Sequence, residues 1–144
     1  MTETVHFGGQ DVPVDAEVVT AVNEPILTLE PLRHITTLRE LRVVHTDPHT
    51  QPAHWFDDLE PLRDLVRLER LELPDSRVAD LSPLAGLRRL RRLDVRRTRV
   101  RDLDPLRGLP ELRELDIQGA EVTDLSPLAA LPALQRVDGQ PRHG

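Results

Sequence analysis

Leucine recurs at a fixed spacing along most of the chain, and this repeat constrains the fold more than any other feature of the sequence. Residues 78–99, 100–121 and 122–139 align as successive blocks, the first two of 22 residues each, with apolar residues in the same columns. A fixed period in the twenties predicts a solenoid, in which each repeat buries its apolar face against its neighbours. The columns contain Leu81, Leu103 and Leu125; Leu84, Leu106 and Leu128; Leu87, Leu109 and Leu131; Leu90, Leu112 and Leu134; and Leu93, Leu115 and Val137.

The same repeat extends toward the N-terminus. Residues 26–47 and 56–77 are two further copies, separated by the insertion 48–55. We therefore predict a solenoid of about five repeats over residues 26–138. Residues 139–144 follow it as a short polar tail.

The first 25 residues do not fit the leucine columns. Thr4–Phe7 and Val12–Val14 alternate apolar and polar residues on either side of Gly8-Gly9, which predicts a hairpin. Residues 18–22 are rich in valine and fit either a further strand or a short helix. Because the exposed apolar face of an end repeat needs a cover, we interpret residues 1–25 as an N-terminal cap.

Each repeat contains one segment typical of a strand and one typical of a helical turn. Leu93-Asp94-Val95 and its equivalents alternate apolar and polar residues, which predicts strands stacked in register as a parallel sheet. Ser82-Pro83 and its equivalents combine a good N-cap residue with a proline at the first helical position, so a short helix or 3₁₀ turn is expected there. The strands are expected near residues 41–43, 71–73, 93–95 and 115–117.

This pattern resembles the 22-residue leucine-rich repeat of the internalin type over residues 26–138. The resemblance implies an α/β solenoid that is curved, with a parallel β-sheet on the concave face and short helical or 3₁₀ turns on the convex face. It also implies that the concave face binds a protein partner. The repeat motif is occupied by Leu90, Leu93, Val95, Thr98, Val100, Asp102, Leu103, Pro105 and Leu106.

Two departures from this family limit what the resemblance implies. Internalins are secreted, whereas the N-terminal sequence MTETVHFGGQ lacks a basic region followed by an apolar one, so a cytoplasmic location is the simplest expectation. A ladder of asparagine side chains bonding the turn backbone is also weakened. The positions where the family has asparagine hold Thr46, Ser76, Thr98 and Ala120.

Charge and composition exclude several classes of function. The formal net charge of −6 opposes non-specific binding to nucleic acid or to an anionic membrane, since both need a positive surface. The chain has no cysteine, and no apolar run approaches the roughly 18 residues of a membrane span. It has no phosphate-binding loop and no supported Ser-His-Asp motif, and an open sheet does not enclose paired carboxylates. We therefore expect neither enzyme activity nor a cofactor.

Eight arginines lie between Arg88 and Arg101, with Asp94 as the only acidic residue among them. In a solenoid, residues one period apart are neighbours. Five of these arginines then face an acid on an adjacent repeat, which predicts a lattice of ion pairs. An acidic partner is the alternative interpretation. The predicted pairs are Arg89 with Glu111, Arg91 with Glu69, Arg92 with Glu114, Arg97 with Asp75, and Arg99 with Glu121.

The outward-facing residues of the predicted strands form three columns across the sheet. The acids of the second column would lie about 4.8 Å apart, and a row of like charges is mildly destabilising. Either the neighbouring arginines neutralise it, or a basic or mixed-charge partner does. The columns are Glu40, Arg70, Arg92, Glu114 and Arg136; Arg42, Glu72, Asp94, Asp116 and Asp138; and Val44, Pro74, Arg96, Gln118 and Gln140.

The insertion 48–55 is the least repeat-like part of the solenoid. Together with its flank it holds three histidines and Trp55, the only tryptophan of the chain. Pro48 and Pro52 break any helical spacing of the histidines, so we do not expect a metal site. The segment is either a solvated loop with Trp55 packed on the solenoid or an interaction loop, since exposed tryptophan is a favoured binding anchor.

Two functions from different classes fit these observations. The first is a protein-binding module that recognises its partner with the concave face. The alternative is a structural protein that self-associates through its last repeat, whose leucines have little chain after them as cover. A distinct partner in an affinity capture favours the first function, and self-association alone favours the second. The predicted protein-binding residues are Arg42, Val44, Trp55, Glu72, Pro74, Arg92, Asp94, Arg96, Glu114, Asp116 and Gln118.

Overall fold

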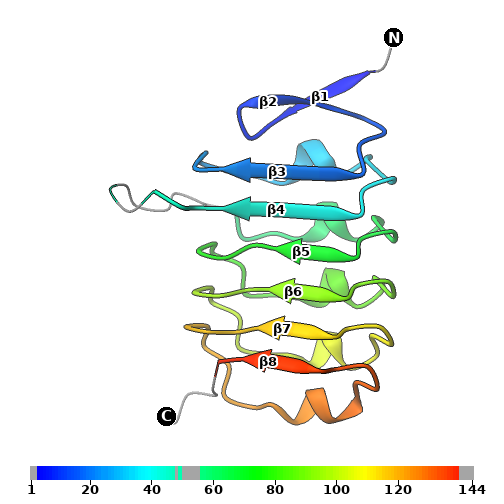
Figure 1. Ribbon diagram of the computed structural model, residues 1–144, viewed down its shortest axis with the longest axis vertical. Coiled ribbons are helices and arrows are strands. Elements are labelled where there is room, and N and C mark those ends of the chain that lie inside the picture. Colours follow the sequence, from blue (N-terminus) through cyan, green and yellow to red (C-terminus); the bar gives the residue numbers. More distant parts are fainter. Residues whose placement is uncertain (1–2, 48, 50–55, 140–144) are drawn as a thin grey trace.

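A computed structural model describes residues 3–47, 49 and 56–139. Within these residues, six parallel strands form one sheet in chain order, and five short 3₁₀ turns lie behind it (Figure 1). This is the α/β solenoid that the repeat predicts. The strands are β3 (Val18–Val22), β4 (Glu40–Val44), β5 (Arg70–Glu72), β6 (Arg92–Asp94), β7 (Glu114–Asp116) and β8 (Arg136–Asp138). The turns are η1 (Glu30–Leu32), η2 (Glu60–Leu62), η3 (Ser82–Leu84), η4 (Asp104–Leu106) and η5 (Ser126–Ala130).

The pairing of the strands confirms the leucine columns. Leu93 lies between Leu71 and Leu115 on the adjoining strands, and each of the three is at most 1% exposed. Leu71 in turn pairs with Leu41, so the register continues past the insertion between β4 and β5. The core is therefore a stack of apolar layers, each supplied by one repeat.

The 3₁₀ turns begin differently from the sequence prediction, which made Ser82 and its equivalents N-caps. In the structure Leu81 precedes the turn, no side chain caps it from that position, and Ser82 is the first residue of the turn. The capping side chain is that of Asp80, two residues before Ser82. Its Oδ1 accepts a hydrogen bond from Ser82 N at 2.8 Å. Such an Asx turn satisfies a backbone N–H that an N-cap would otherwise bond. The same bond is made by Thr28, Asp58, Asp102 and Asp124.

The turns that follow two of the strands are closed by hydroxyl groups. Ser76 Oγ donates a hydrogen bond to Leu73 O at 2.9 Å, and Thr98 Oγ1 donates to Val95 O at 2.7 Å. Both side chains are only 4% exposed. Each hydroxyl therefore donates to a carbonyl of its own turn, at a position where the internalin-type repeat has asparagine.

The N-terminal segment contains the predicted hairpin. β1 (Thr4–Phe7) pairs antiparallel with β2 (Gln10–Pro13), and Gly8 and Gly9 adopt positive φ at the turn. The next segment, β3, is a strand that pairs in parallel with β4 and so extends the repeat sheet. The placement of a cap boundary at residue 25 stays a prediction.

The last repeat is less covered than the repeats before it. Leu128 and Leu131 are 9% and 7% exposed, whereas the equivalent Leu106 and Leu109 are fully buried at 0%. Leu134 is only partly buried. The apolar layers of the solenoid are therefore least complete at the β8 end.

The stacked leucine positions generate a stability prediction. Leu93→Ala removes apolar surface from a fully buried layer and leaves a cavity, so we expect a loss of about 2–5 kcal/mol in the free energy of unfolding. Chemical denaturation followed by circular dichroism measures it. Arg88→Ala, an exposed position on the same repeat, is the control and should change that free energy by less than about 0.5 kcal/mol. Equal unfolding midpoints for the Leu93→Ala variant and the unaltered protein would contradict the assigned layer.

Candidate protein-binding face

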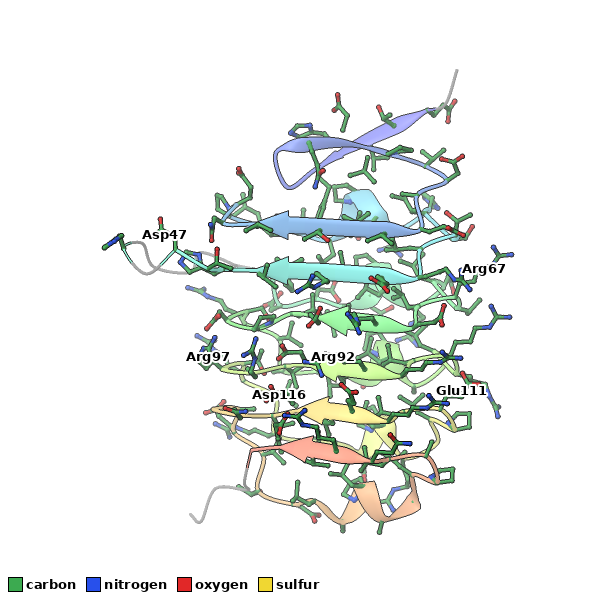
Figure 2. The ribbon with its side chains drawn as sticks, in the orientation of Figure 1. Asp47, Arg67, Arg92, Arg97, Glu111 and Asp116 are labelled. Atoms are coloured by element: carbon green, nitrogen blue, oxygen red, sulfur yellow. The ribbon has the colours of Figure 1, made fainter. Side chains whose placement is uncertain are left out.

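The sheet face opposite the 3₁₀ turns carries the predicted columns. Strand pairing places Glu40, Arg70, Arg92, Glu114 and Arg136 side by side in chain order. The second column is likewise continuous from β4 to β8. Side chains of both columns, among them Arg92 and Asp116, stand over the strands in Figure 2.

The acidic second column is not the exposed surface that the sequence predicts. Glu72, Asp94 and Asp116 are 7%, 1% and 5% exposed. They alternate with the buried leucines and so belong to the outer face of the sheet. Arg42 of the same column and Arg92 and Arg96 of the neighbouring columns pair with them, and this covers them. The prediction that these three carboxylates form contact surface for a partner is corrected accordingly.

Arg96 holds two of the buried carboxylates. Its Nε lies 3.0 Å from Asp94 Oδ1 and 3.5 Å from Asp116 Oδ2. The backbone N–H groups of Arg96 and Gln118 donate to Asp94 Oδ1 and Asp116 Oδ1, each at 3.1 Å. Of the two interpretations of the acidic row, the structure therefore supports neutralisation by the arginines of this chain.

A second series of ion pairs links the strands from β4 to β7. Arg42 Nε contacts Glu72 Oε2, and neither of these buried atoms has a further hydrogen-bond partner. Glu72 Oε1 lies 3.4 Å from Arg92 Nε, and Arg92 Nη1 lies 2.6 Å from Glu114 Oε2. Because a buried charge is costly to leave unpaired, these contacts fix the positions of the arginines over β4 to β7.

The third column differs from its prediction at Pro74. Val44 is half-buried and Gln118 is exposed, but Pro74 is buried and offers little contact surface. Trp55 lies outside the described residues, so its predicted place beside this column stays a prediction.

Sequence reasoning missed two residues of this face, both on β3. Val18 and Val22 are 56% and 46% exposed, and Val22 stands beside Val44 on β4. The signal was present in the sequence, because the outward Val18, Thr20 and Val22 alternate with buried residues such as Val19. The sheet face therefore has an apolar end at β3, where Val22 adjoins Val44, and a charged remainder.

Three of the five predicted ion pairs of the arginine-rich repeat are confirmed. Each joins an arginine to an acid one period away, as the solenoid geometry requires. They are Arg91 with Glu69 at 3.6 Å, Arg92 with Glu114 at 2.6 Å, and Arg97 with Asp75 at 2.5 Å.

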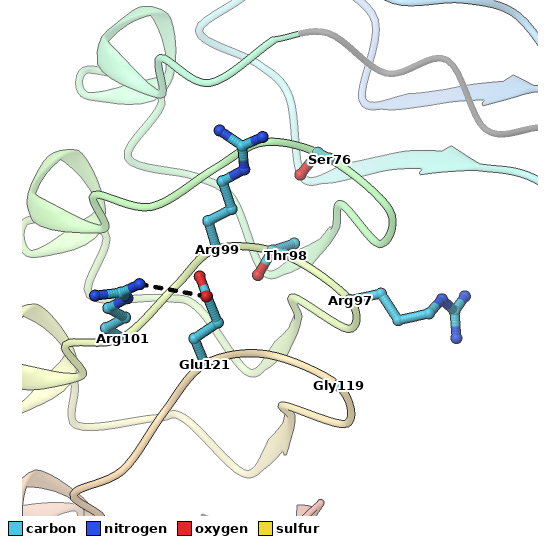
Figure 3. A pocket seen from close by; sticks show the side chains of 7 residues that line it. All are labelled: Ser76, Arg97, Thr98, Arg99, Arg101, Gly119 and Glu121. Atoms are coloured by element: carbon cyan, nitrogen blue, oxygen red, sulfur yellow. Dashed lines mark hydrogen bonds and ion pairs between the residues drawn. The ribbon is translucent and has the colours of Figure 1, made fainter. Parts of the chain in front are cut away.

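The other two predicted pairs are wrong. Glu121 pairs with Arg101 at 3.3 Å rather than with Arg99. The reason is direction: both arginines leave the same coil, but Arg101 points toward Glu121 while Arg99 points away from it (Figure 3). Arg89 and Glu111 border one shallow groove, and the described residues contain no ion pair between them.

The described part of the chain contains no group of three His, Cys, Asp or Glu side chains placed to hold a metal ion. Of the three histidines considered for such a site, His45 and His49 are described, and His54 lies outside the described residues. Over the same described residues, none of the helices has the length and apolar character that crossing a membrane requires.

The pKa of Asp116 is raised, because burial penalises its charged form and Asp94 repels it, which outweighs the hydrogen bond from the Gln118 N–H. The folded state therefore binds this proton more tightly than the unfolded chain does. Such a group favours folding below its unfolded-state pKa, and this contribution is lost as pH rises through the raised folded-state pKa.

This linkage generates a prediction for Asp116→Asn, which keeps the shape of the side chain and removes its charge. We expect the free energy of unfolding of the variant, relative to the unaltered protein, to increase between about pH 4 and pH 7. Urea unfolding at both pH values measures the change. If the stability of the variant relative to the unaltered protein falls over this range, folding favours the ionised carboxylate of Asp116, and the argument from burial is wrong.

Comparisons with known proteins agree with this geometry. The family described as leucine-rich repeats, in two copies, matches residues 88–130. No curated protein gives a significant match. Among solved structures, an internalin C2 of Listeria monocytogenes is 20% identical with a TM-score of 0.59, over 92% of this chain and 86% of the other. An internalin F of the same species is 20% identical with a TM-score of 0.48, over 90% of this chain and 50% of the other.

The family match covers the second half of repeat 78–99, all of repeat 100–121 and the first half of repeat 122–139. Strand pairing carries the same layers from β4 to β8, well beyond the matched residues. The similarity to internalin C2 shows the fold. Repeat sequence, register and overall architecture thus agree, and the chain has the fold of a leucine-rich repeat solenoid.

Proposed function

We propose that this protein is a non-enzymatic binding module whose concave sheet face recognises a protein partner. Leucine-rich repeat solenoids present extended concave surfaces of this kind for binding. The observation that carries the proposal is the apolar end of the face at β3, where exposed Val22 stands beside half-buried Val44 and Val18 is exposed on the same strand. Protein interfaces commonly combine an apolar centre with a polar rim.

The charged remainder of the face supplies such a rim. Arg92 and Arg96 are partly exposed, yet their guanidinium groups are already held by acids of this chain. A side chain that is fixed before binding loses less conformational entropy when a partner docks. In this proposal Arg42, Val44, Arg92, Arg96, Glu114 and Gln118 provide surface, while Glu72, Pro74, Asp94 and Asp116 support it from below.

The proposal predicts the effect of Val22→Asp, which places a charge in the apolar end. Immobilised protein is used to capture partners from a lysate of the source organism, and any captured protein is then titrated against the purified variants. We expect Val22→Asp to weaken its binding by about tenfold or more, because apolar anchors carry much of the binding energy of an interface.

Val66→Asp is the matched control. Val66 is 55% exposed, close to the 46% of Val22, but it lies between η2 and β5 and outside the sheet. A partner that binds through the concave face should bind the Val66→Asp variant normally. Full binding to the Val22→Asp variant, or loss only with Val66→Asp, would refute the assigned face.

Self-association is a second candidate function, favoured by the incomplete cover of the last repeat. Leu134 is only partly buried, and Leu128 is 9% exposed. Sedimentation velocity over a range of protein concentrations tests it, with the expected outcome of a dimer that forms as concentration rises. A species of monomer mass at every concentration would rule this function out. The cytoplasmic location stays a prediction under either function.

A further inference from the structure

A hollow of about 500 Å³ lies where the chain turns after β6, outside the three columns of the sheet face (Figure 3). Arg97, Arg99 and Arg101 line it from one coil, and Gly119 and Glu121 line it from the next. Three arginines therefore border one small space on a protein whose formal net charge is −6. Neither function proposed above uses this space.

The three arginines differ in how their charge is compensated. Arg97 donates two hydrogen bonds to Asp75, at 2.5 and 2.9 Å. Arg101 makes a single contact of 3.3 Å with Glu121. Among the described residues no carboxylate forms an ion pair with Arg99, and its side chain extends toward the preceding coil (Figure 3). The hollow therefore contains one guanidinium group that no described acid of this chain neutralises.

The hydroxyl groups at the hollow are already occupied as donors. Thr98 donates to Val95 O at 2.7 Å, and Ser76 donates to Leu73 O at 2.9 Å. The side-chain donors that remain for a ligand are guanidinium N–H groups, whose planar arrangement matches the two oxygens of a carboxylate. The chemistry of the hollow thus favours a carboxylate over a neutral polar group.

Gly119 keeps one wall of the hollow free of a side chain. Its φ is 73°, in the left-handed region that glycine adopts without strain. A Cβ at this position would lie 2.9 Å from Arg97 Cγ. Any other residue here would push against the stem of Arg97 and narrow the space beside the arginines.

We propose that this hollow binds a carboxylate side chain from an acidic segment of a protein partner, with Arg99 as its principal contact. This inference rests on the proposed protein-binding function and adds the chemistry of the partner. The net charge of −6 opposes a long polyanion such as nucleic acid. A short acidic segment meets mainly the local field of the arginines, because exposed charges farther away than about 8 Å are screened at physiological salt.

The test uses the full chain and a fluorescent peptide of alternating glycine and glutamate, with a glycine–glutamine peptide as the uncharged probe. Fluorescence anisotropy measures binding. We expect only the glutamate peptide to bind, and its affinity to fall as salt is raised. Arg99→Gln should weaken binding by about tenfold, as loss of a charge-assisted hydrogen bond predicts.

Arg88→Gln is the matched control, since it also removes one exposed arginine charge but lies outside the hollow. It should leave peptide affinity unchanged, and circular dichroism of both variants checks that they are folded. An equal loss of peptide affinity with both variants would mean that net charge alone explains the effect, and it would overturn the proposal. Failure of the glutamate peptide to bind would overturn it directly.

A competition with inorganic phosphate distinguishes a peptide site from a site for free anions. Displacement of the peptide by an equal concentration of phosphate would overturn the assignment to an acidic segment. The Val22→Asp variant should bind the glutamate peptide as the unaltered protein does. Failure of the concave-face proposal alone therefore leaves the peptide result standing, whereas failure of the hollow alone leaves the Val22→Asp capture result standing.

Discussion

Contact between the leucines of consecutive coils holds this fold together, because no single coil can bury its own apolar residues. Leu93 shows the arrangement, with Leu71 on one side and Leu115 on the other and no exposed surface. The register is strict, since a slip of one residue would turn the leucines of a strand outward and its polar residues inward. The insertion before residue 56 does not disturb it, because β4 and β5 still pair leucine with leucine.

The same register decides what happens on the opposite face of the sheet. Residues that share a repeat position must stack whether or not their charges agree, which brings Asp94 next to Glu72 and Asp116. The chain accommodates this row by laying arginines over it, and Arg96 alone contacts two of the carboxylates. The arginine layer thus has two roles: it neutralises buried acids, and its outer side forms part of the surface available to a partner.

Most of the fold could be predicted from the sequence, because a period of 22 residues fixes which residues become neighbours. The columns, the parallel strands and three of the arginine pairs all follow from counting along this period. Counting does not give the direction of a long side chain. The prediction therefore paired Glu121 with Arg99, whereas Arg101 makes that pair. Nor does it give burial by arginines, which hid Asp94 from solvent.

The apolar part of the candidate site escaped prediction for a different reason. β3 contains valine and alanine where the later strands have leucine, so the column pattern did not reach it, although Val19 pairs with Leu41. Capping was misassigned because Ser82 is a good N-cap residue by type, while Asp80 makes the bond. The local competition between two hydrogen-bonding side chains is decided by turn geometry, which residue type alone does not specify.

The repeat of residues 78–99 contains Arg91, Arg92, Arg96 and Arg97, and each of these pairs with an acid of an adjoining repeat. Loss of this repeat as a unit would rejoin the leucine columns without a break, since it is one whole period. Glu72 would then stack on Asp116, and the acids on both sides would lose their contacts with these four arginines. The coils are thus interchangeable in shape but not in charge. The ion pairs of the polar layer therefore constrain the order of the repeats. Recombination between repeats could conserve the architecture and still destabilise the protein, because it would separate these pairs.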